Sequence, residues 1–105
     1  MSHSTVRVLR HATPLRNVRS ILRSGLLPGL ARGRLKAVWL HTPSRSSWAI
    51  PHVANRHHVQ EELVAVLTVE VPRSWLRKRG RGVWCCARAI SPEWVVSVRL
   101  AFAVA

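Results

Sequence analysis

The chain has 105 residues, enough for one folded domain with a modest core, and its 48% hydrophobic content excludes a disordered basic tail. Its 17 Lys and Arg residues face only four acidic residues, which gives a formal net charge of +13. We therefore expect a single domain over residues 1–105 whose partner or substrate is a polyanion.

The basic residues are mostly arginines, 15 of 17, which favours bidentate phosphate binding and stacking over diffuse lysine charge. All four acids are glutamates, and the first 60 residues contain none. The alternative explanation for the many arginines is a GC-rich genome, whose codons favour Arg at solvent-exposed positions. It accounts for Arg over Lys, but not for the near absence of acids.

Location and metal content follow from what the chain lacks. No apolar run approaches the roughly 20 residues of a membrane span, and the N-terminus has no signal-peptide core. The two cysteines, Cys85 and Cys86, are adjacent, a spacing that rarely forms a disulfide and does not match a structural zinc site. We expect a cytoplasmic protein with no membrane contact and no metal site.

The first predicted elements are a strand and a capped helix. Residues 6–9 are extended-chain formers, and we expect their strand to end at residues 11–13. Thr13 is the predicted N-cap, and Pro14 takes the first helical position, where its missing N–H costs nothing. Gly25 stands where a left-handed C-cap is needed. The predicted buried face of the helix consists of Leu15, Val18, Ile21 and Leu22.

The middle of the chain is predicted as a basic loop over 31–36, a strand over 37–42 and a short helix. Because Pro51 breaks the first helical turn, we expect a loop from Ser44 that leads into a helix from about Pro51. A helix that ran through Pro51 would place Trp48, Ala49, His52, Val53 and Arg56 on one shared side.

The second half is rich in strands. The β-branched run 63–71 predicts a central strand bounded by Pro72, and the basic segment 75–82 predicts a hairpin or loop. A short strand over 83–87, a turn over 91–94 and a last strand over 95–104 follow. The last strand turns Val96, Val98, Leu100, Phe102 and Val104 to one side. The fold class is therefore α+β.

The motifs LRHAT, ILRSGLLP, VWLHT, ANRHH, VAVLTVEV, GVW and AISPEWV occur in an order that resembles the ADP-ribosyltransferase fold. In particular the chain is similar to the C-terminal, NAD-binding lobe of the RNA 2'-phosphotransferases, where a His-Gly-Thr strand precedes a helix ending in Gly-Leu-x-Pro. The resemblance covers roughly residues 8–96. It implies a split β-sheet core with two or three short helices, and NAD as a substrate.

The resemblance also implies site residues. His11, Ala12 and Thr13 fall on His-Gly-Thr, where the strand-end backbone receives the nicotinamide amide and the His contacts a ribose. Trp39 would stack on or wall the nicotinamide. The implied NAD-binding residues are His11, Ala12, Thr13, Arg32, Trp39, Thr42 and Val83.

The implied catalytic residues are His11, Arg34 and Arg56. Arg32 or Arg34 falls near an arginine that meets the transferred 2'-phosphate in the family, and the alignment leaves the choice open. Arg56 falls on the arginine of a Gly-x-Arg motif. The candidate ligands for a pyrophosphate or an acceptor phosphate are Arg16, Arg32, Arg34 and Arg56.

Two departures limit the resemblance. The 105 residues hold no counterpart of the family's N-terminal lobe, which grips the RNA phosphate, so we expect splice-junction chemistry only with a partner chain that supplies those residues. Val83 falls at or beside the catalytic glutamate of many ADP-ribosyltransferases. The phosphotransferases also lack that glutamate, so NAD chemistry stays compatible with the sequence.

The first functional hypothesis is transfer of ADP-ribose from NAD to a nucleic acid or phosphorylated acceptor. The second is a catalytically inactive module of the same fold that binds RNA or DNA, and the third is a basic structural protein of a ribonucleoprotein. The predicted nucleic-acid contacts are Arg77, Lys78, Arg79 and Arg81. Purely structural roles compete with these: a core histidine for His11, core packing for Trp39, Trp48 and Trp84, and simple solvation for His57, His58 and the basic loop.

Overall fold

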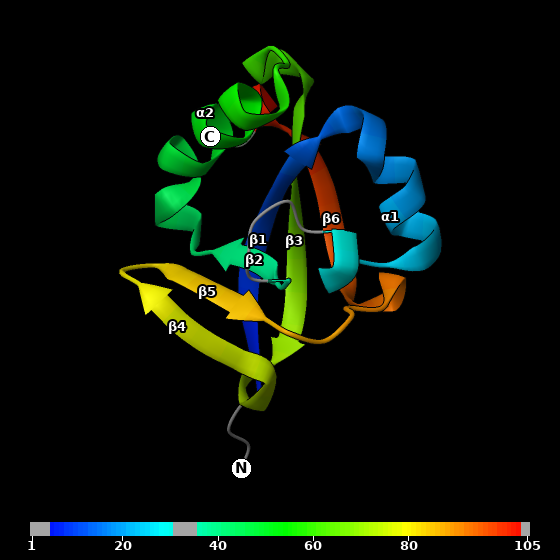
Figure 1. The fold of residues 1–105 in the computed structure, drawn as a ribbon, viewed down its shortest axis with the longest axis vertical. Helices are drawn as coiled ribbons and strands as arrows, with labels where there is room; N and C mark the ends of the chain where they lie inside the picture. Colours follow the sequence, from blue (N-terminus) through cyan, green and yellow to red (C-terminus); the bar gives the residue numbers. More distant parts are fainter. Residues whose placement is uncertain (1–4, 31–35, 104–105) are drawn as a thin grey trace.

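The computed structural model describes residues 5–30 and 36–103, and these form an antiparallel sheet flanked by two α-helices (Figure 1). This confirms the α+β class. The strands are β1 (Val6–Pro14), β2 (Val38–His41), β3 (Val64–Pro72), β4 (Leu76–Gly80), β5 (Val83–Cys86) and β6 (Val95–Leu100). The helices are α1 (Val18–Ser24) and α2 (Ser46–His57). No helix among the described residues has the length and apolar character needed to cross a membrane.

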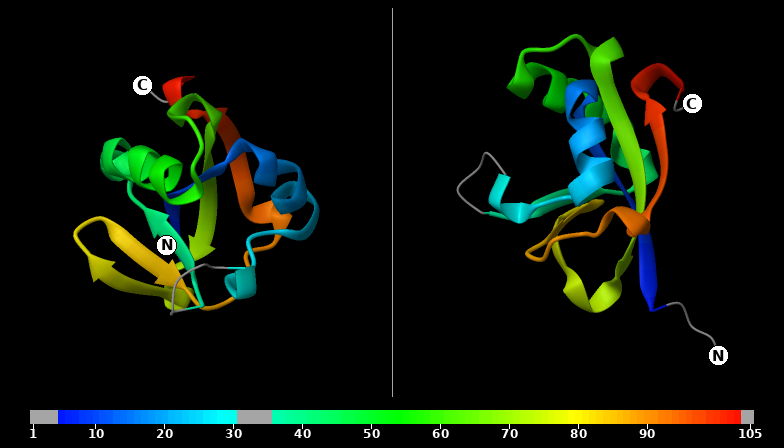
Figure 2. Two further views of the ribbon diagram at one scale, coloured as in Figure 1. Left: turned by 45° about the horizontal axis from the view of Figure 1, so that its top comes forward. Right: turned by 90° about the vertical axis from the view of Figure 1, so that its right-hand side faces the viewer.

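The sheet has the strand order β4-β5-β2-β1-β3-β6 and is unevenly joined. β1 and β3 pair along all nine residues of each strand. β1 and β2 pair only at Arg10 and His41. The sheet therefore consists of a scaffold half (β1, β3 and β6) and a hairpin half (β2, β5 and β4), which meet at this β1–β2 junction. Figure 2 shows the β4–β5 hairpin standing away from the other strands.

Each helix covers a different part of the sheet. Ile21 of α1 joins a core cluster with Leu9 and Leu67, while Ile50 of α2 joins a second cluster with Val66. Because side chains alternate along a strand, neighbouring residues of β3 such as Val66 and Leu67 enter different clusters. β3 is therefore buried on both faces, as its continuous apolar run predicts.

The N-terminal strand is longer than predicted, and Thr13 is not a helix cap. Thr13 pairs with Ala65 inside the β1–β3 ladder, so its backbone belongs to the sheet. A 3-10 turn, Leu15–Asn17, follows the strand, and α1 begins only at Val18 without a side-chain cap. Gly25 ends α1 at a positive φ of 87°, and its N–H donates to the Ile21 carbonyl. The positive φ was expected, although ψ is extended (−176°) rather than left-handed helical.

The buried face of α1 is narrower than predicted. Ile21 is buried and Val18 packs against the core, but Leu15 and Leu22 are 40% and 48% exposed. Leu15 lies in the 3-10 turn, and Leu22 is turned by about 100° from Ile21 around the helix axis. Only the i, i+3 line from Val18 to Ile21 therefore reaches the sheet.

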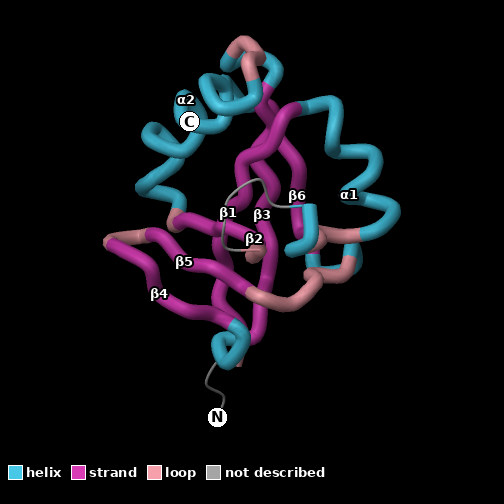
Figure 3. The backbone as a smooth tube through the Cα atoms, viewed as in Figure 1, coloured by secondary structure: helices cyan, strands magenta, loops and turns pink. Residues whose placement is uncertain are grey.

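The prediction of a loop up to Pro51 was wrong, because α2 runs from Ser46 through Pro51 to His57. Figure 3 shows it as one continuous helical segment after the end of β2. Pro51 has no N–H to donate to the carbonyl of Ser47. Both residues are exposed, so water can bind that carbonyl instead. His58 ends the helix in the left-handed conformation.

In the second half, the basic segment forms β4 and the turn of a hairpin, in which β4 pairs with β5. β3 lies inside the sheet, as predicted. The last strand is shorter than expected: it ends at Leu100, a 3-10 turn covers Ala101–Ala103, and Val104 lies outside the described residues. Val96, Val98 and Leu100 of the edge strand β6 are exposed.

Candidate ligand-binding site at the split of the sheet

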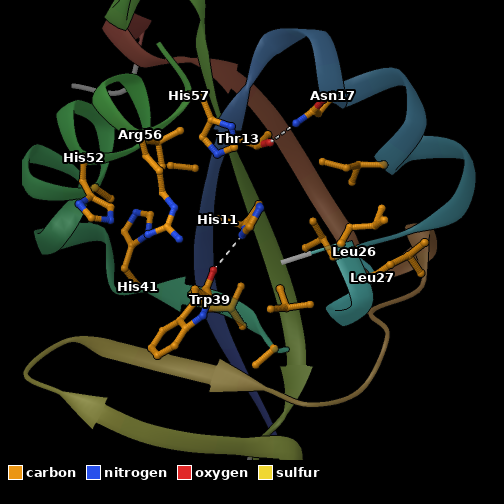
Figure 4. A pocket seen from close by; sticks show the side chains of 18 of the residues that line it. His11, Thr13, Asn17, Leu26, Leu27, Trp39, His41, His52, Arg56 and His57 are labelled. Carbon is orange, nitrogen blue, oxygen red and sulfur yellow. Dashed lines mark hydrogen bonds between the residues drawn. The ribbon is translucent and has the colours of Figure 1, made fainter. Parts of the chain in front are cut away.

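A cavity of about 650 Å³ lies where the two halves of the sheet separate. Its walls come from β1, α1, the segment that follows α1, β2 and α2, together with Val83 at the start of β5. This volume is in the range of small-molecule and cofactor sites, roughly 300–1,000 Å³. Figure 4 shows side chains from both helices and from β1 and β2 directed into one space.

His11 lies at the point where β1 and β2 separate. The register of the junction, Arg10 opposite His41, would place Ala12 opposite Trp39 if the ladder continued, but that pair is not formed. Instead, the Nδ1 atom of His11 lies 2.8 Å from the Trp39 carbonyl oxygen (Figure 4). The imidazole therefore bridges β1 and β2 where their backbone pairing stops.

The protonation of His11 follows from this bond. A carbonyl oxygen can only accept, so Nδ1 carries the proton. Burial lowers the pKa of His11, and the charge of nearby His57 lowers it further, against the raising effect of the Trp39 carbonyl. The ring is therefore neutral at pH 7, and its Nε2 atom is an acceptor inside the cavity.

His41 is a second neutral histidine of the cavity. Burial, with repulsion from His11, Arg10 and Arg45, lowers its pKa to about 4. The Ser46 hydroxyl accepts a hydrogen bond from Arg10 at 3.2 Å and lies 3.4 Å from Nε2 of His41. Arg10 can only donate, so the Ser46 oxygen accepts that bond, and the tautomer of His41 decides which partner donates in the contact between Ser46 and Nε2. This chain ties the start of α2 to the junction.

One side of α2 faces the cavity. The five residues that the sequence placed on a common helical side all line it: Trp48, Ala49, His52, Val53 and Arg56. The Trp48 and His52 rings stack at 4.9 Å. Arg56 points from the helix into the cavity (Figure 4). The helical spacing was therefore right although the predicted start of the helix was not.

The opposite wall is apolar and comes from α1 and the segment after it. It contains Ile21, Leu26, Leu27 and Leu30, of which Leu27 and Leu30 are 39% and 74% exposed. Leu26 is fixed by a pair of backbone hydrogen bonds with Ile90. A Cβ atom at Gly25 would collide with the Ile90 carbonyl, so glycine is required for this close approach.

The structure brings most of the predicted NAD-site residues together. His11, Ala12, Thr13, Trp39, Arg56 and Val83 line the cavity. Thr42 does not: its hydroxyl contacts Ser44 at 3.1 Å, and its N–H donates to Gly82. Arg16 is exposed on the turn before α1, outside the lining, and Arg32 and Arg34 lie outside the described residues.

Sequence reasoning missed several lining residues. Asn17 donates to the Thr13 hydroxyl at 3.4 Å, and Ser20, His41, Leu26 and His57 also border the cavity. Most belong to elements that meet only in the tertiary structure, and no local motif marks them. The helical periodicity of α1 could have indicated Asn17 and Ser20, since they share one side of the chain with Ile21.

The cavity is free of negative charge. None of its lining residues is Asp or Glu, and the first 60 residues of the sequence contain no acid at all. Within the described part of the chain, no three His, Cys, Asp or Glu side chains are grouped so as to hold a metal ion. The site therefore offers an arginine, neutral histidines, aromatic rings and an apolar wall, a set suited to an anionic ligand with flat rings.

The chain matches no protein-family model and no curated protein sequence.

Proposed function

We propose that the chain is an NAD-dependent ADP-ribosyltransferase-like enzyme that transfers ADP-ribose to a nucleic acid or a phosphorylated acceptor. The observation that carries the proposal is a cavity at the split of the sheet that combines neutral His11 with Arg56 and has no carboxylate in its lining. The motif resemblance at residues 11–13 supplies the identity of the ligand.

The charges of the cavity suit a dinucleotide. Arg56 is a permanent cation directed into the cavity, and it would hold a pyrophosphate by charge-assisted hydrogen bonds. The apolar wall around Leu26 and Leu27 suits a flat ring system. His11 offers Nε2 as an acceptor for a ribose hydroxyl, because its Nδ1 proton is used by the Trp39 carbonyl.

The proposed reaction needs no carboxylate when the acceptor is a phosphate. The bond between nicotinamide and ribose C1 breaks, and its electron pair neutralises the nicotinamide ring. The acceptor phosphate oxygen then forms the new bond to C1. The oxygen is already ionised and the leaving group departs neutral, so neither a general base nor a general acid is required. The chain's own task is to fix the two ends of NAD in position.

Calorimetric titration with NAD tests the binding step, with Arg56→Ala against Arg19→Ala as matched variants. Both remove one arginine from a helix, but Arg19 is exposed on α1 outside the cavity lining. We expect Arg56→Ala to weaken NAD binding about 10- to 100-fold and Arg19→Ala to leave it within about twofold. Equal effects of the two variants, or no NAD binding by the folded wild type, would overturn the proposal.

Nicotinamide release in the presence of RNA or DNA tests the transfer step. We expect His11→Ala to abolish release, since the Nε2 acceptor and the hydrogen bond to the Trp39 carbonyl are lost together. Circular dichroism melts show whether the variant is folded. The acceptor that stimulates release identifies the acceptor class.

The second candidate is a catalytically inactive module that binds RNA or DNA on the same fold. The basic hairpin favours it, because Arg77, Arg79 and Arg81 are exposed and none of them lines the cavity. Tight, salt-sensitive nucleic-acid binding without NAD turnover, and unchanged by His11→Ala, would select this candidate.

A further inference from the structure

The basic residues of β4 lie on two different faces of the sheet. The register aligns Arg77 with Cys85 and Trp39 in one row across β4, β5 and β2. The next row contains Lys78, Trp84 and Leu40. Directly opposed residues of antiparallel strands share a face and successive rows alternate, so Arg77 and Lys78 point to opposite faces.

Side-chain contacts agree with this division. Lys78 Nζ lies 5.8 Å from the centre of the Trp84 ring, which the Arg7 guanidinium also contacts at 4.7 Å. Arg79 lies within the register shift between Lys78 and Gly80, and its Nε donates to Cys85 Sγ at 3.3 Å. Arg77 and Arg79 therefore share the face of Trp39, which we call the Trp39 face, whereas Lys78 belongs to the other.

Trp39 differs from the other four tryptophans. Each of those has a ring or cation against its indole: Trp48 has His52 and Arg45, Trp75 and Trp94 stack on each other, and Trp84 has Arg7 and Lys78. Among the described residues, no such contact is made by the Trp39 ring, which is 40% exposed at the edge of the cavity. Trp39 is therefore a partly exposed aromatic residue at the cavity, and its ring stacks on no other ring or cation of the described residues.

The turn of the hairpin is fixed beside the start of α2. The Thr42 N–H donates to the Gly82 carbonyl at 2.9 Å, and Gly82 packs so closely on Arg45 that a Cβ atom there would collide with its side chain. Figures 1 and 2 show the β4–β5 turn close to this end of α2. Residues 71–92 contain no acid, so no carboxylate of this segment neutralises the arginines.

We propose that the Trp39 face binds a single-stranded nucleic acid, with phosphates on Arg77 and Arg79 and a base stacked on Trp39 at the cavity edge. Adjacent strands lie about 5 Å apart, so Arg77 and Trp39, two strands from each other, are about 10 Å apart at the backbone. One short stretch of nucleic acid can contact both. The role of this single-stranded nucleic acid as the ADP-ribose acceptor rests on the proposed function.

A single strand fits this surface better than a duplex does. The bases of a duplex are stacked on one another and expose only their edges, so their faces cannot stack on an indole. An unpaired base has a free face, and stacking on an aromatic side chain is tolerant of sequence. Arginines in a row beside an open ring are the combination that such binding uses.

Fluorescence anisotropy with a labelled oligouridylate or oligodeoxythymidylate tests the proposal, without NAD present. Arg77→Ala and Lys78→Ala are matched variants, because they remove one exposed charge each from adjacent positions on opposite faces. We expect Arg77→Ala to weaken binding about tenfold and to lower the salt-dependence slope by about 0.7. Lys78→Ala is expected to stay within about twofold of wild type. Trp39→Leu is expected to weaken binding about tenfold.

Three results would overturn the proposal: equal loss in the two charge variants, a same-length duplex that binds as tightly as the single strand, or no binding at all. Arg79→Ala provides a second charge variant on the Trp39 face, should Arg77→Ala not fold. NAD binding is measured separately without oligonucleotide. If NAD fails to bind while the face-dependent pattern holds, the binding surface is supported and only its role as the route of the acceptor is lost.

Discussion

The two halves of the sheet differ in both cohesion and charge. In the scaffold half, β1 and β3 pair along nine residues and bury apolar side chains on both faces. All four glutamates lie in this half or in the turns that enter its strands, at Glu61, Glu62, Glu70 and Glu93. The hairpin half contains no acid in its three strands and joins the scaffold at one residue pair.

This difference explains where the cavity lies. A continuous ladder would have closed the space between β1 and β2, and an acidic neighbour would have neutralised Arg56. Because β1 and β3 pair along nine residues, we expect the scaffold half to carry most of the stability, which leaves the junction free to hold polar side chains such as His11. Function of the kind proposed depends on a weak junction supported by a strong sheet.

The largest expected effect on stability comes from shortening a buried side chain in the scaffold half. Leu67 is fully buried in β3, so Leu67→Ala should lower the free energy of unfolding by about 2–5 kcal/mol through lost burial and a residual cavity. Leu100→Ala on β6, where the side chain is 47% exposed, should cost less than about 1 kcal/mol. Urea denaturation measures both. Similar losses would show that the buried strand β3 contributes no more to stability than the edge strand β6.

Acid should weaken the junction. The pKa of His41 is about 4 in the folded chain, against 6.5 for an ordinary histidine. Between these two pH values the unfolded chain therefore binds a proton that the folded chain does not. The free energy of unfolding is therefore at its full value above pH 6.5. It should fall by about 3 kcal/mol as the pH drops to about 4. The lowered pKa of His11 acts in the same direction.

Urea denaturation over this pH range measures the acid effect, with His41→Gln as the comparison. Glutamine keeps a polar group near Ser46 but does not titrate. We expect a shallower pH dependence in the variant. An identical slope in both proteins would assign the acid sensitivity to groups outside the junction.

The smallest effect is expected at the turn of the hairpin. Gly82 has a positive φ of 68° and packs against Thr42 and Arg45, so Gly82→Ala should destabilise the chain by about 1–2 kcal/mol. At Gly80 a Cβ atom would meet open space, and Gly80→Ala should change stability by less than about 0.5 kcal/mol. Thermal unfolding compares the two. If Gly80→Ala is the more damaging variant, the turn does not tie the hairpin half to α2.

Much of the fold could be predicted from local pattern. The apolar run of β3, the strand around Val38 and the turn before Trp94 are all present, because each depends on a few neighbouring side chains. The failures at Thr13 and Pro51 have a common cause. Pairing with β3 kept Thr13 in the sheet, and packing of Ile50 against Val66 held a helix across a proline. In both places tertiary contacts outweighed a local signal.

The sequence by itself determined the chemistry of this protein: the +13 charge, the absence of acids before residue 61, the α+β class and the side of α2 that carries Trp48, His52 and Arg56. Only the tertiary structure decided that β2 leaves β1 after one pair, that His11 contacts the Trp39 carbonyl, and that Arg77 lies in one row with Trp39. Strand register and a split between strands arise from contacts between distant residues. Periodicity along the chain carries no information about which strands those residues pair with.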